Sequence, residues 1–191
     1  MTTDLTGLAT PALLLDQPRL QRNVTRIADR ARTLGVRFRP HVKTHKCVEV
    51  ARLQRAAGAT GLMVSTLAEA RVFAAHGFDD LTYGVPIEPG KSAVVSALVG
   101  QGVRLGVITD DLSVPGPLGE VAAAAGVTLD VWIKVDTGYH RCGVAPAGDA
   151  LPALAERIGT HRALRFAGLL THAGHAYHAR GLSAVRQVAT A

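Results

Sequence analysis

The sequence predicts an α/β fold, and within that class an incomplete (β/α)8 TIM barrel with about six βα units. Three observations support this prediction. Apolar, strand-like segments alternate with helical segments along the chain, each strand is entered from a helix through a glycine, and polar residues follow the strands. This combination is typical of parallel strands whose carboxyl ends share one functional edge.

The helices are predicted from capping residues that precede apolar residues at helical spacing. The first begins after Asp16, has Pro18 in its first turn and ends at Gly35. The same signals predict further helices at residues 47–58, 66–77, 89–102, 117–125, 150–158 and 182–191. The apolar segments between them are the six expected strands, at residues 36–41, 61–64, 81–85, 103–109, 128–136 and 163–172.

Two architectures fit this order of elements, an open doubly wound sheet and a barrel. The GxGxxG fingerprint of an open dinucleotide-binding sheet does not occur. Polar residues end or follow all six strands, whereas an open sheet concentrates them at one switch point. A barrel is therefore favoured. A closed barrel needs eight strands and about 250 residues, so we expect this sequence to be truncated at its C-terminal side.

The composition restricts the class of protein. With 191 residues, 48% of them hydrophobic, the chain can bury one good core. It contains no apolar run of about 18 residues, so no membrane-spanning segment is expected, and residues 1–10 do not resemble a secretory signal. Cys47 and Cys142 are the only cysteines, which favours a reducing compartment. We expect a cytoplasmic protein.

The net charge of +6 does not indicate a nucleic-acid-binding protein. Many of the arginines recur at helical spacing on one face of the first predicted helix, opposite its apolar face. No aromatic residues are interleaved with them for stacking on bases. The pattern is that of a solvated helix face, and no nucleic-acid partner is expected.

The most informative segment is the run RPHVKTHK at residues 39–46, directly behind a strand-like stretch. Mutual repulsion and partial desolvation of its cationic side chains would lower a lysine pKa toward neutrality. A lysine that is neutral part of the time is a nucleophile that can form a Schiff base with a carbonyl. The other interpretation of the run is a solvated basic turn.

A second candidate segment is KVDTGYHRCGV at residues 134–144. Alternation along a strand puts Lys134 and Asp136 on one face, and Arg141 can reach back over the strand end. Such an arginine can hold an oxygen anion or keep a ring nitrogen unprotonated. A purely structural Lys–Asp pair is the alternative.

The third segment is THAGHAYH at residues 171–178, whose histidines could bind a metal or pack against a planar ligand. We favour the ligand for His172, which is expected to point inward, with His175 and His178 at the mouth of the site. No metal ligands are predicted within this chain. A fourth segment, Ser65-Thr66, is most simply a helix N-cap whose hydroxyls could also contribute to the site.

Taken together, these segments resemble the fold-type III pyridoxal-phosphate enzymes, the alanine-racemase-like barrel group. Within that group the sequence most resembles the D-threonine aldolase and D-serine dehydratase branch. The residues that carry the resemblance are TPALLLD at 10–16, RPHVKTHK at 39–46, DTG at 136–138 with Arg141 and Gly143-Val144, and THAGH at 171–175.

The resemblance implies the roles of individual residues. Lys43 would be the catalytic residue and form the Schiff base with pyridoxal phosphate, and the cofactor-contacting residues would be Lys43, His41, Arg141, His172 and Tyr177. Residues 1–16 would join a second, β-rich domain, and residues 17–191 would form the partial barrel. The resemblance also implies that the last barrel units hold the cofactor phosphate and that a C-terminal β domain binds a divalent metal. We expect both to be absent from this chain.

The implied function is that of a pyridoxal-phosphate-dependent lyase acting on D-β-hydroxy amino acids, either by aldol cleavage or by dehydration. The implied partners are a small D-amino acid substrate and a second copy of the chain in a homodimer. An amino-acid racemase, a non-catalytic cofactor-binding protein and an inactive remnant are the alternatives. The sequence does not choose between cleavage and dehydration.

Overall fold

The computed structural model describes residues 4–190. Residues 1–3 of the expected N-terminal segment and residue 191 of the expected last helix lie outside the described residues. The α-helices are α1 (Gln17–Thr33), α2 (Val48–Ala56), α3 (Leu67–Ala75), α4 (Ser92–Gly100), α5 (Pro115–Ala124), α6 (Ala150–Gly159) and α7 (Gly181–Thr190). The strands are β1 (Leu62–Val64), β2 (Asp80–Pro86), β3 (Arg104–Thr109), β4 (Leu129–Val135) and β5 (Leu164–Thr171).

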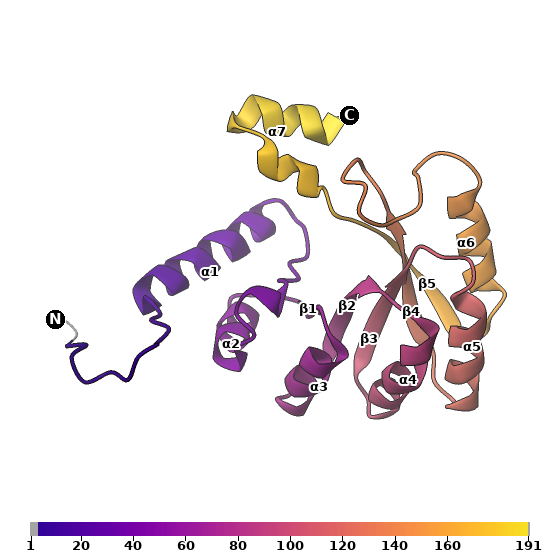
Figure 1. The fold of residues 1–191 in the computed structure, drawn as a ribbon, viewed down its shortest axis with the longest axis horizontal. Helices are drawn as coiled ribbons and strands as arrows, with labels where there is room; N and C mark the ends of the chain where they lie inside the picture. The colour runs from indigo at the N-terminus through magenta and orange to yellow at the C-terminus, as the bar shows by residue number, and fades with distance from the viewer. Residues whose placement is uncertain (1–3, 191) are drawn as a thin grey trace.

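The strands form one parallel, five-stranded sheet in the order β1-β2-β3-β4-β5, which is also their order in the chain. A doubly wound sheet would reverse its order at a switch point, whereas a barrel adds each strand beside the last. Helices α3 to α6 cover the outer face of the curved sheet, and its inner face is left open (Figure 1). The predicted incomplete barrel is therefore confirmed.

The prediction of a sixth strand at residues 36–41 is wrong, although the segment does run beside β1. Only His41 forms a bridge, with Met63. The carbonyls of Phe38 and Pro40 accept hydrogen bonds from the amides of Thr60 and Met63, at 2.9 Å in both cases. Pro40 has no N–H to donate, so the segment cannot complete the ladder that a strand requires.

The core lies between the sheet and its outer helices. Strand residues that point outward, such as Leu105 and Leu129, are buried with Leu118 of α5 and Leu154 of α6. The inner face is instead polar toward the amino ends of the strands, where Asp80, Arg104, Asp130 and Arg165 border a hollow of about 590 Å³ together with Trp132 and other residues. The alternation of side chains along each strand thus separates an apolar outer layer from a polar inner layer.

Local signals determine most helix boundaries. The side chain of Asp16 accepts a hydrogen bond from the Arg19 amide and caps α1, as expected. A short 3₁₀ helix (Pro89–Lys91) precedes α4, and α5 begins at Pro115, two residues before the predicted start. No helix within residues 4–190 is long and apolar enough to cross a membrane.

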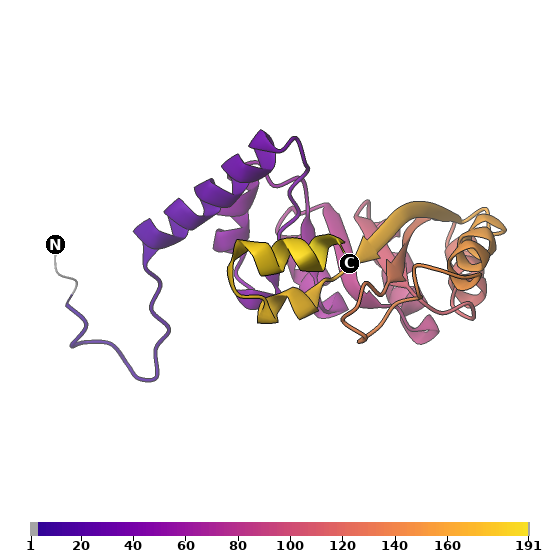
Figure 2. The ribbon, with the colours of Figure 1, turned by 90° about the horizontal axis from the view of Figure 1, so that it is seen from above.

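The chain before α1 lies apart from the sheet. Residues 4–16 form no helix or strand, and Leu13, Leu14 and Leu15 are exposed. Viewed from above, this segment and α1 extend away from the sheet (Figure 2). The expectation that residues 1–16 join a second domain stays a prediction.

Candidate functional site

Lys43 lies in a 3₁₀ helix (Val42–Thr44) that starts where residues 36–41 leave the sheet. Val42 is fully buried and anchors this turn, and the ring of His41 caps it by accepting the Lys43 amide hydrogen at 3.4 Å. The Lys43 side chain itself is exposed, so the expected desolvation of this lysine is not observed. Lys43 also makes no ion pair within residues 4–190, which leaves its ammonium or amine group available to a ligand.

His41 connects Lys43 to the neighbouring strand end. Its Nε2 and the Ser65 hydroxyl are 3.4 Å apart in a hydrogen bond. Burial, followed by the positive charge of Lys43, lowers the pKa of His41 below 6.5. Because Nδ1 accepts a hydrogen bond, the neutral ring carries its proton on Nε2 and donates it to Ser65.

Ser65 is held in place by Glu69, a residue that was not selected as a candidate from the sequence. Glu69 is buried in the first turn of α3 and accepts a hydrogen bond from the Ser65 amide at 2.8 Å. Its other carboxylate oxygen lies 3.3 Å from the Lys46 ammonium. Thr66 caps α3 by accepting the Glu69 amide hydrogen, as predicted. The one signal in the sequence is that an acidic residue, Glu69, stands at the third helical position after the Thr66 cap, as in a capping box.

The loop after β4 is organised by Asp136. Its carboxylate accepts hydrogen bonds from the amides of Gly138 and His140, at 3.0 Å each, and from the His140 ring at 2.8 Å. The bond from the His140 amide is the largest of the effects that lower the pKa of Asp136 to about 2. Asp136 makes no ion pair with Lys134 in the described structure, so the alternative interpretation, a structural Lys–Asp pair, is not supported.

Gly143 lets this loop return alongside β4. Its φ is +118°, and a Cβ atom there would lie 2.5 Å from the Asp136 nitrogen, so a larger residue cannot be accommodated without a shift. Its amide donates a hydrogen bond to Asp110 at 2.7 Å, and Val144 pairs with β4. The role of Asp110 could not be predicted, because its partner lies 33 residues further along the chain. The returning loop carries Arg141, whose guanidinium lies 5.3 Å from the centre of the Tyr139 ring.

His172 lies at the end of β5 between two tyrosine rings. The ring centres of Tyr139 and Tyr177 are 5.6 and 5.8 Å from that of His172, in edge-to-face geometry. Burial lowers the pKa of His172, and the positive charges of Arg141, Lys134 and Lys43 lower it further. The structure therefore groups the candidates Lys43, His41, Arg141, His172 and Tyr177 at the carboxyl edge of the sheet.

Lys134 is the lysine that the fold removes from water. It points from β4 toward the inner face with only 4% of its surface exposed. Burial is the main cause of its lowered pKa, opposed by Cys142 and reinforced by Arg141. Lys43 was expected from the sequence to be desolvated, but in the structure it is Lys134 that is buried.

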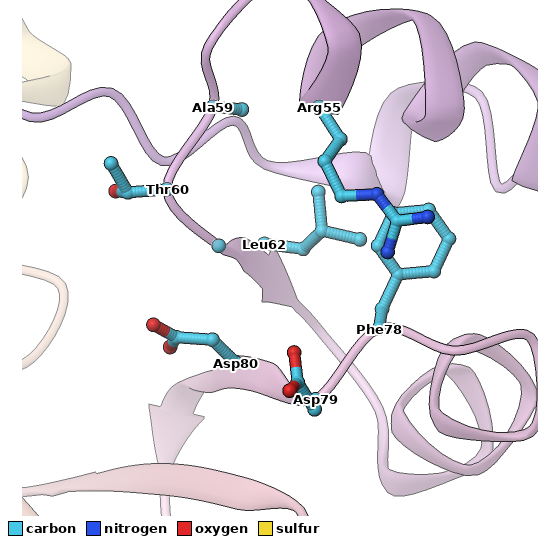
Figure 3. Close-up of a pocket in the computed structure, with 8 residues that line it drawn as sticks. Arg55, Ala59, Thr60, Leu62, Phe78, Asp79 and Asp80 are labelled. Atoms are coloured by element: carbon cyan, nitrogen blue, oxygen red, sulfur yellow. The ribbon is translucent and has the colours of Figure 1, made fainter.

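Other candidate sites are less well formed. Within residues 4–190, no group of three or more His, Cys, Asp and Glu side chains is arranged to hold a metal ion. A cavity of about 50 Å³ lies at the amino edge of the sheet, where Arg55 covers the Phe78 ring at 4.4 Å and Asp79 and Asp80 approach from the other side (Figure 3). It is far smaller than a typical ligand pocket of about 300 Å³ or more.

Comparisons with known proteins agree with this geometry. The sequence model of the alanine racemase N-terminal domain family matches residues 15–190. A D-threo-3-hydroxyaspartate dehydratase from Delftia sp. (strain HT23) is 40% identical over 177 residues, which cover 93% of this chain and 47% of that protein. The chain thus spans about half the length of the curated relatives it matches.

Two solved structures show the same arrangement of elements. The D-threo-3-hydroxyaspartate dehydratase from Delftia sp. HT23 superposes with a TM-score of 0.90 at 38% identity, over 96% of this chain and 48% of that one. A D-threonine aldolase from Filomicrobium marinum gives a TM-score of 0.79 at 37% identity, over 85% of this chain and 43% of that one. On both sequence and structure, the chain belongs to the alanine racemase N-terminal domain family.

Proposed function

We propose that this chain is the cofactor-binding barrel part of a pyridoxal-phosphate-dependent lyase that acts on D-β-hydroxy amino acids. The observation that carries the proposal is the grouping at the carboxyl edge of the sheet, where the Tyr139 and Tyr177 rings flank His172, Arg141 lies on the Tyr139 ring, and Lys43 occupies the turn after residues 36–41. The names of the similar proteins, a D-threo-3-hydroxyaspartate dehydratase and a D-threonine aldolase, support the substrate class. Because the chain spans about half of such proteins, the activity is proposed for the protein that contains it.

The charges of the site fit an anionic cofactor that carries a carbonyl group. Asp136, Asp110 and Glu69 each accept a hydrogen bond from a backbone amide of the protein. Lys43 and Arg141 make no ion pair within residues 4–190. The excess of positive charge favours a phosphorylated aldehyde. Lys43 would hold it covalently, and His41, Arg141, His172 and Tyr177 would contact it.

The chemistry then divides between the cofactor and the chain. When bound, pyridoxal phosphate supplies an electron sink for negative charge at the substrate Cα. The Lys43 amine would be the group that takes the Cα proton in dehydration. Arg141 attracts and orients an anionic oxygen, while the lowered pKa values of His41 and His172 keep both rings neutral near pH 7.

A divalent metal that binds the substrate hydroxyl would favour loss or cleavage at Cβ. We expect its ligands in the part of the protein that the relatives have beyond this match. A homodimer and a cytoplasmic location are further parts of the proposal. The homodimer rests on the resemblance to the aldolase and dehydratase branch, and the cytoplasmic location rests on the presence of only two cysteines.

Cofactor attachment can be tested on this chain by adding pyridoxal phosphate, reducing with borohydride and mapping the labelled peptides. The expected result is a label on Lys43 that disappears in Lys43→Ala. Lys91→Ala is the matched control, because Lys91 is a partly exposed lysine at another strand end. Equal labelling of Lys43 and Lys91 would contradict a specific site.

The reaction class can be tested on the longer protein with D-threo-3-hydroxyaspartate and a divalent metal. Dehydration releases ammonia and leaves oxaloacetate, whereas aldol cleavage yields glycine and glyoxylate. We expect dehydration, because the 40%-identical relative carries that activity in its name. Inversion at Cα without either set of products would instead identify a racemase.

A further inference from the structure

We propose that Arg39 is a positioning residue for Lys43. It would act by holding residues 36–41, the backbone segment that leads into the 3₁₀ helix of Lys43. The function of Lys43 rests on the proposal above, whereas the structural role of Arg39 can be tested without it. Lys43 is exposed and has no ion-pair partner in the described structure, so the position of its backbone sets the region that its amine can reach.

That backbone has few ties to the sheet. Residues 36–41 form no strand, and their carbonyls accept only two backbone hydrogen bonds from the chain that leads into β1, at Phe38 and Pro40. No described strand pairs with the other edge of this segment. Residues 36–41, which lead to Lys43, therefore need contacts other than strand hydrogen bonds to hold them against the sheet.

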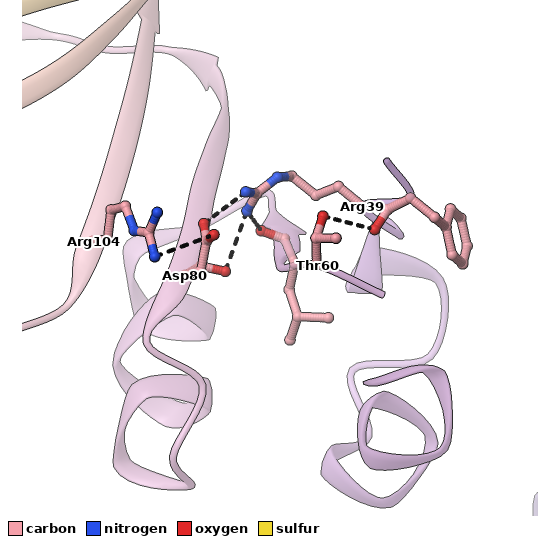
Figure 4. A network of polar contacts seen from close by, with 6 residues as sticks. Arg39, Thr60, Asp80 and Arg104 are labelled. Carbon is pink, nitrogen blue, oxygen red and sulfur yellow. Dashed lines mark hydrogen bonds and ion pairs between the residues drawn. The ribbon is translucent and has the colours of Figure 1, made fainter. Parts of the chain in front are cut away.

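The Arg39 side chain supplies this connection. Its guanidinium passes across β1, where Nη1 donates to the Leu62 carbonyl at 3.4 Å, and continues to β2, where Nη1 donates to the Asp80 carbonyl at 3.2 Å. Nη2 forms an ion pair with the Asp80 carboxylate at 2.6 Å (Figure 4). Arg104 approaches the same carboxylate at 3.8 Å. One side chain thus joins the Lys43 segment to the first two strands.

Gly61 provides the space for this crossing. A Cβ atom built on Gly61 would lie 2.2, 2.6 and 2.8 Å from three atoms of the Arg39 guanidinium. An alanine at this position would therefore displace the guanidinium from Asp80. Gly61→Ala should reproduce the effect of losing the Arg39 interactions, and the two substitutions should not add to each other.

Hydrogen exchange of individual amides tests the structural part without any cofactor. In Arg39→Gln and Gly61→Ala we expect the protection of the Thr60 and Met63 amides to fall about tenfold, with Ile133 in β4 unchanged. The double variant should match Arg39→Gln, and Arg39→Lys should restore part of the protection. Arg37→Gln, a neighbouring exposed arginine that borders the same hollow, is the control and should exchange like the wild type.

Cofactor labelling tests the consequence for Lys43. The ratio of borohydride-fixed label on Lys43 to that on Lys91 should fall about tenfold in Arg39→Gln and stay unchanged in Arg37→Gln, because small misplacements of a reactive group strongly reduce its rate. Unchanged Met63 protection in Arg39→Gln overturns the structural part of the proposal, and an unchanged labelling ratio overturns the positioning of Lys43. Loss of Ile133 protection as well would mean that Arg39 holds the whole sheet, which also overturns the proposal. If the wild type does not label at Lys43, the proposed function fails, and hydrogen exchange alone decides the role of Arg39.

Discussion

At the scale of single residues, the candidate site combines exposed cations with histidines that the fold keeps neutral. His41 and His172 belong to segments more than 100 residues apart, yet the positive charge of Lys43 lowers the pKa of both. Lys134 adds a buried cation beneath the same edge. The acidic residues nearby are occupied with holding loops. Because these acidic residues are engaged elsewhere, they do not neutralise the positive charges of the site.

The pKa of His172 reports this arrangement directly. We expect Arg141→Gln to raise the pKa of His172 toward 6.5, because the positive charge of Arg141 is removed. Burial of the ring, the larger cause of the lowered pKa, remains. Titration of the ring signals by NMR measures the change. Arg22→Gln, on the exposed face of α1, should leave the titration as in the wild type. No change in Arg141→Gln would mean that Arg141 does not face His172 in solution.

The same histidines predict how stability depends on pH. His41, His45 and His172 have pKa values lowered below 6.5 in the folded chain, chiefly by burial. The unfolded chain therefore binds more protons as the pH falls through 6.5, and the free energy of unfolding should decrease between pH 7.5 and about 5.5. Asp136 affects stability in a lower pH range. Its lowered pKa stabilises the folded chain above pH 3.8, and this stabilisation is lost as the pH falls toward about 2.

Urea unfolding at a series of pH values checks this dependence. His45→Gln removes one of the titrating rings and should make the slope between pH 7.5 and 5.5 shallower. A flat stability profile in the wild type over that interval would contradict the pKa directions of the three histidines.

At the scale of elements, α3 connects the carboxyl edge of the sheet to the core. Thr66 caps this helix by accepting the Glu69 amide hydrogen. The Glu69 carboxylate in turn accepts a hydrogen bond from the Ser65 amide and pairs with the Lys46 ammonium. Thr66→Ala should lower the free energy of unfolding by about 1 kcal/mol, the usual effect of losing an N-cap. Thr25→Ala, in the exposed middle of α1, should not destabilise, since alanine favours a helix interior. Urea unfolding of both variants makes the comparison.

The helix boundaries were the most predictable elements. Asp16 and Thr66 cap their helices as expected, because a cap depends on residues only three positions apart. Residues 36–41 were predicted as a strand because their pattern is apolar and precedes a turn. Pairing requires backbone N–H groups that donate as well as carbonyls that accept, and Pro40 removes one of these donors. The wrong prediction therefore concerns the segment that leads into the 3₁₀ helix of Lys43.

At the scale of the whole molecule, the incomplete barrel leaves β5 as an edge strand of the described sheet. Within residues 4–190, β5 pairs only with β4, and its Phe166 and Leu169 are 44% and 52% exposed. Exposed apolar edges of this kind favour association. We expect the isolated chain to self-associate with rising concentration in analytical ultracentrifugation, and Leu169→Lys to reduce this association. Val72→Lys, an equally exposed apolar position on α3, is the control. Equal association of both variants would exclude the β5 edge.

The sequence by itself determined the alternation of helices and strands, the barrel-like order and the segments that hold Lys43, Arg141 and His172. These features follow from capping residues, periodicity and strand ends, which are local properties of the chain. Only the tertiary structure decided that Lys134 rather than Lys43 is buried, that Asp110 holds Gly143, and that Arg39 reaches Asp80 over Gly61. Burial and pairing between distant segments depend on how the elements pack, and no local pattern in the sequence records that packing.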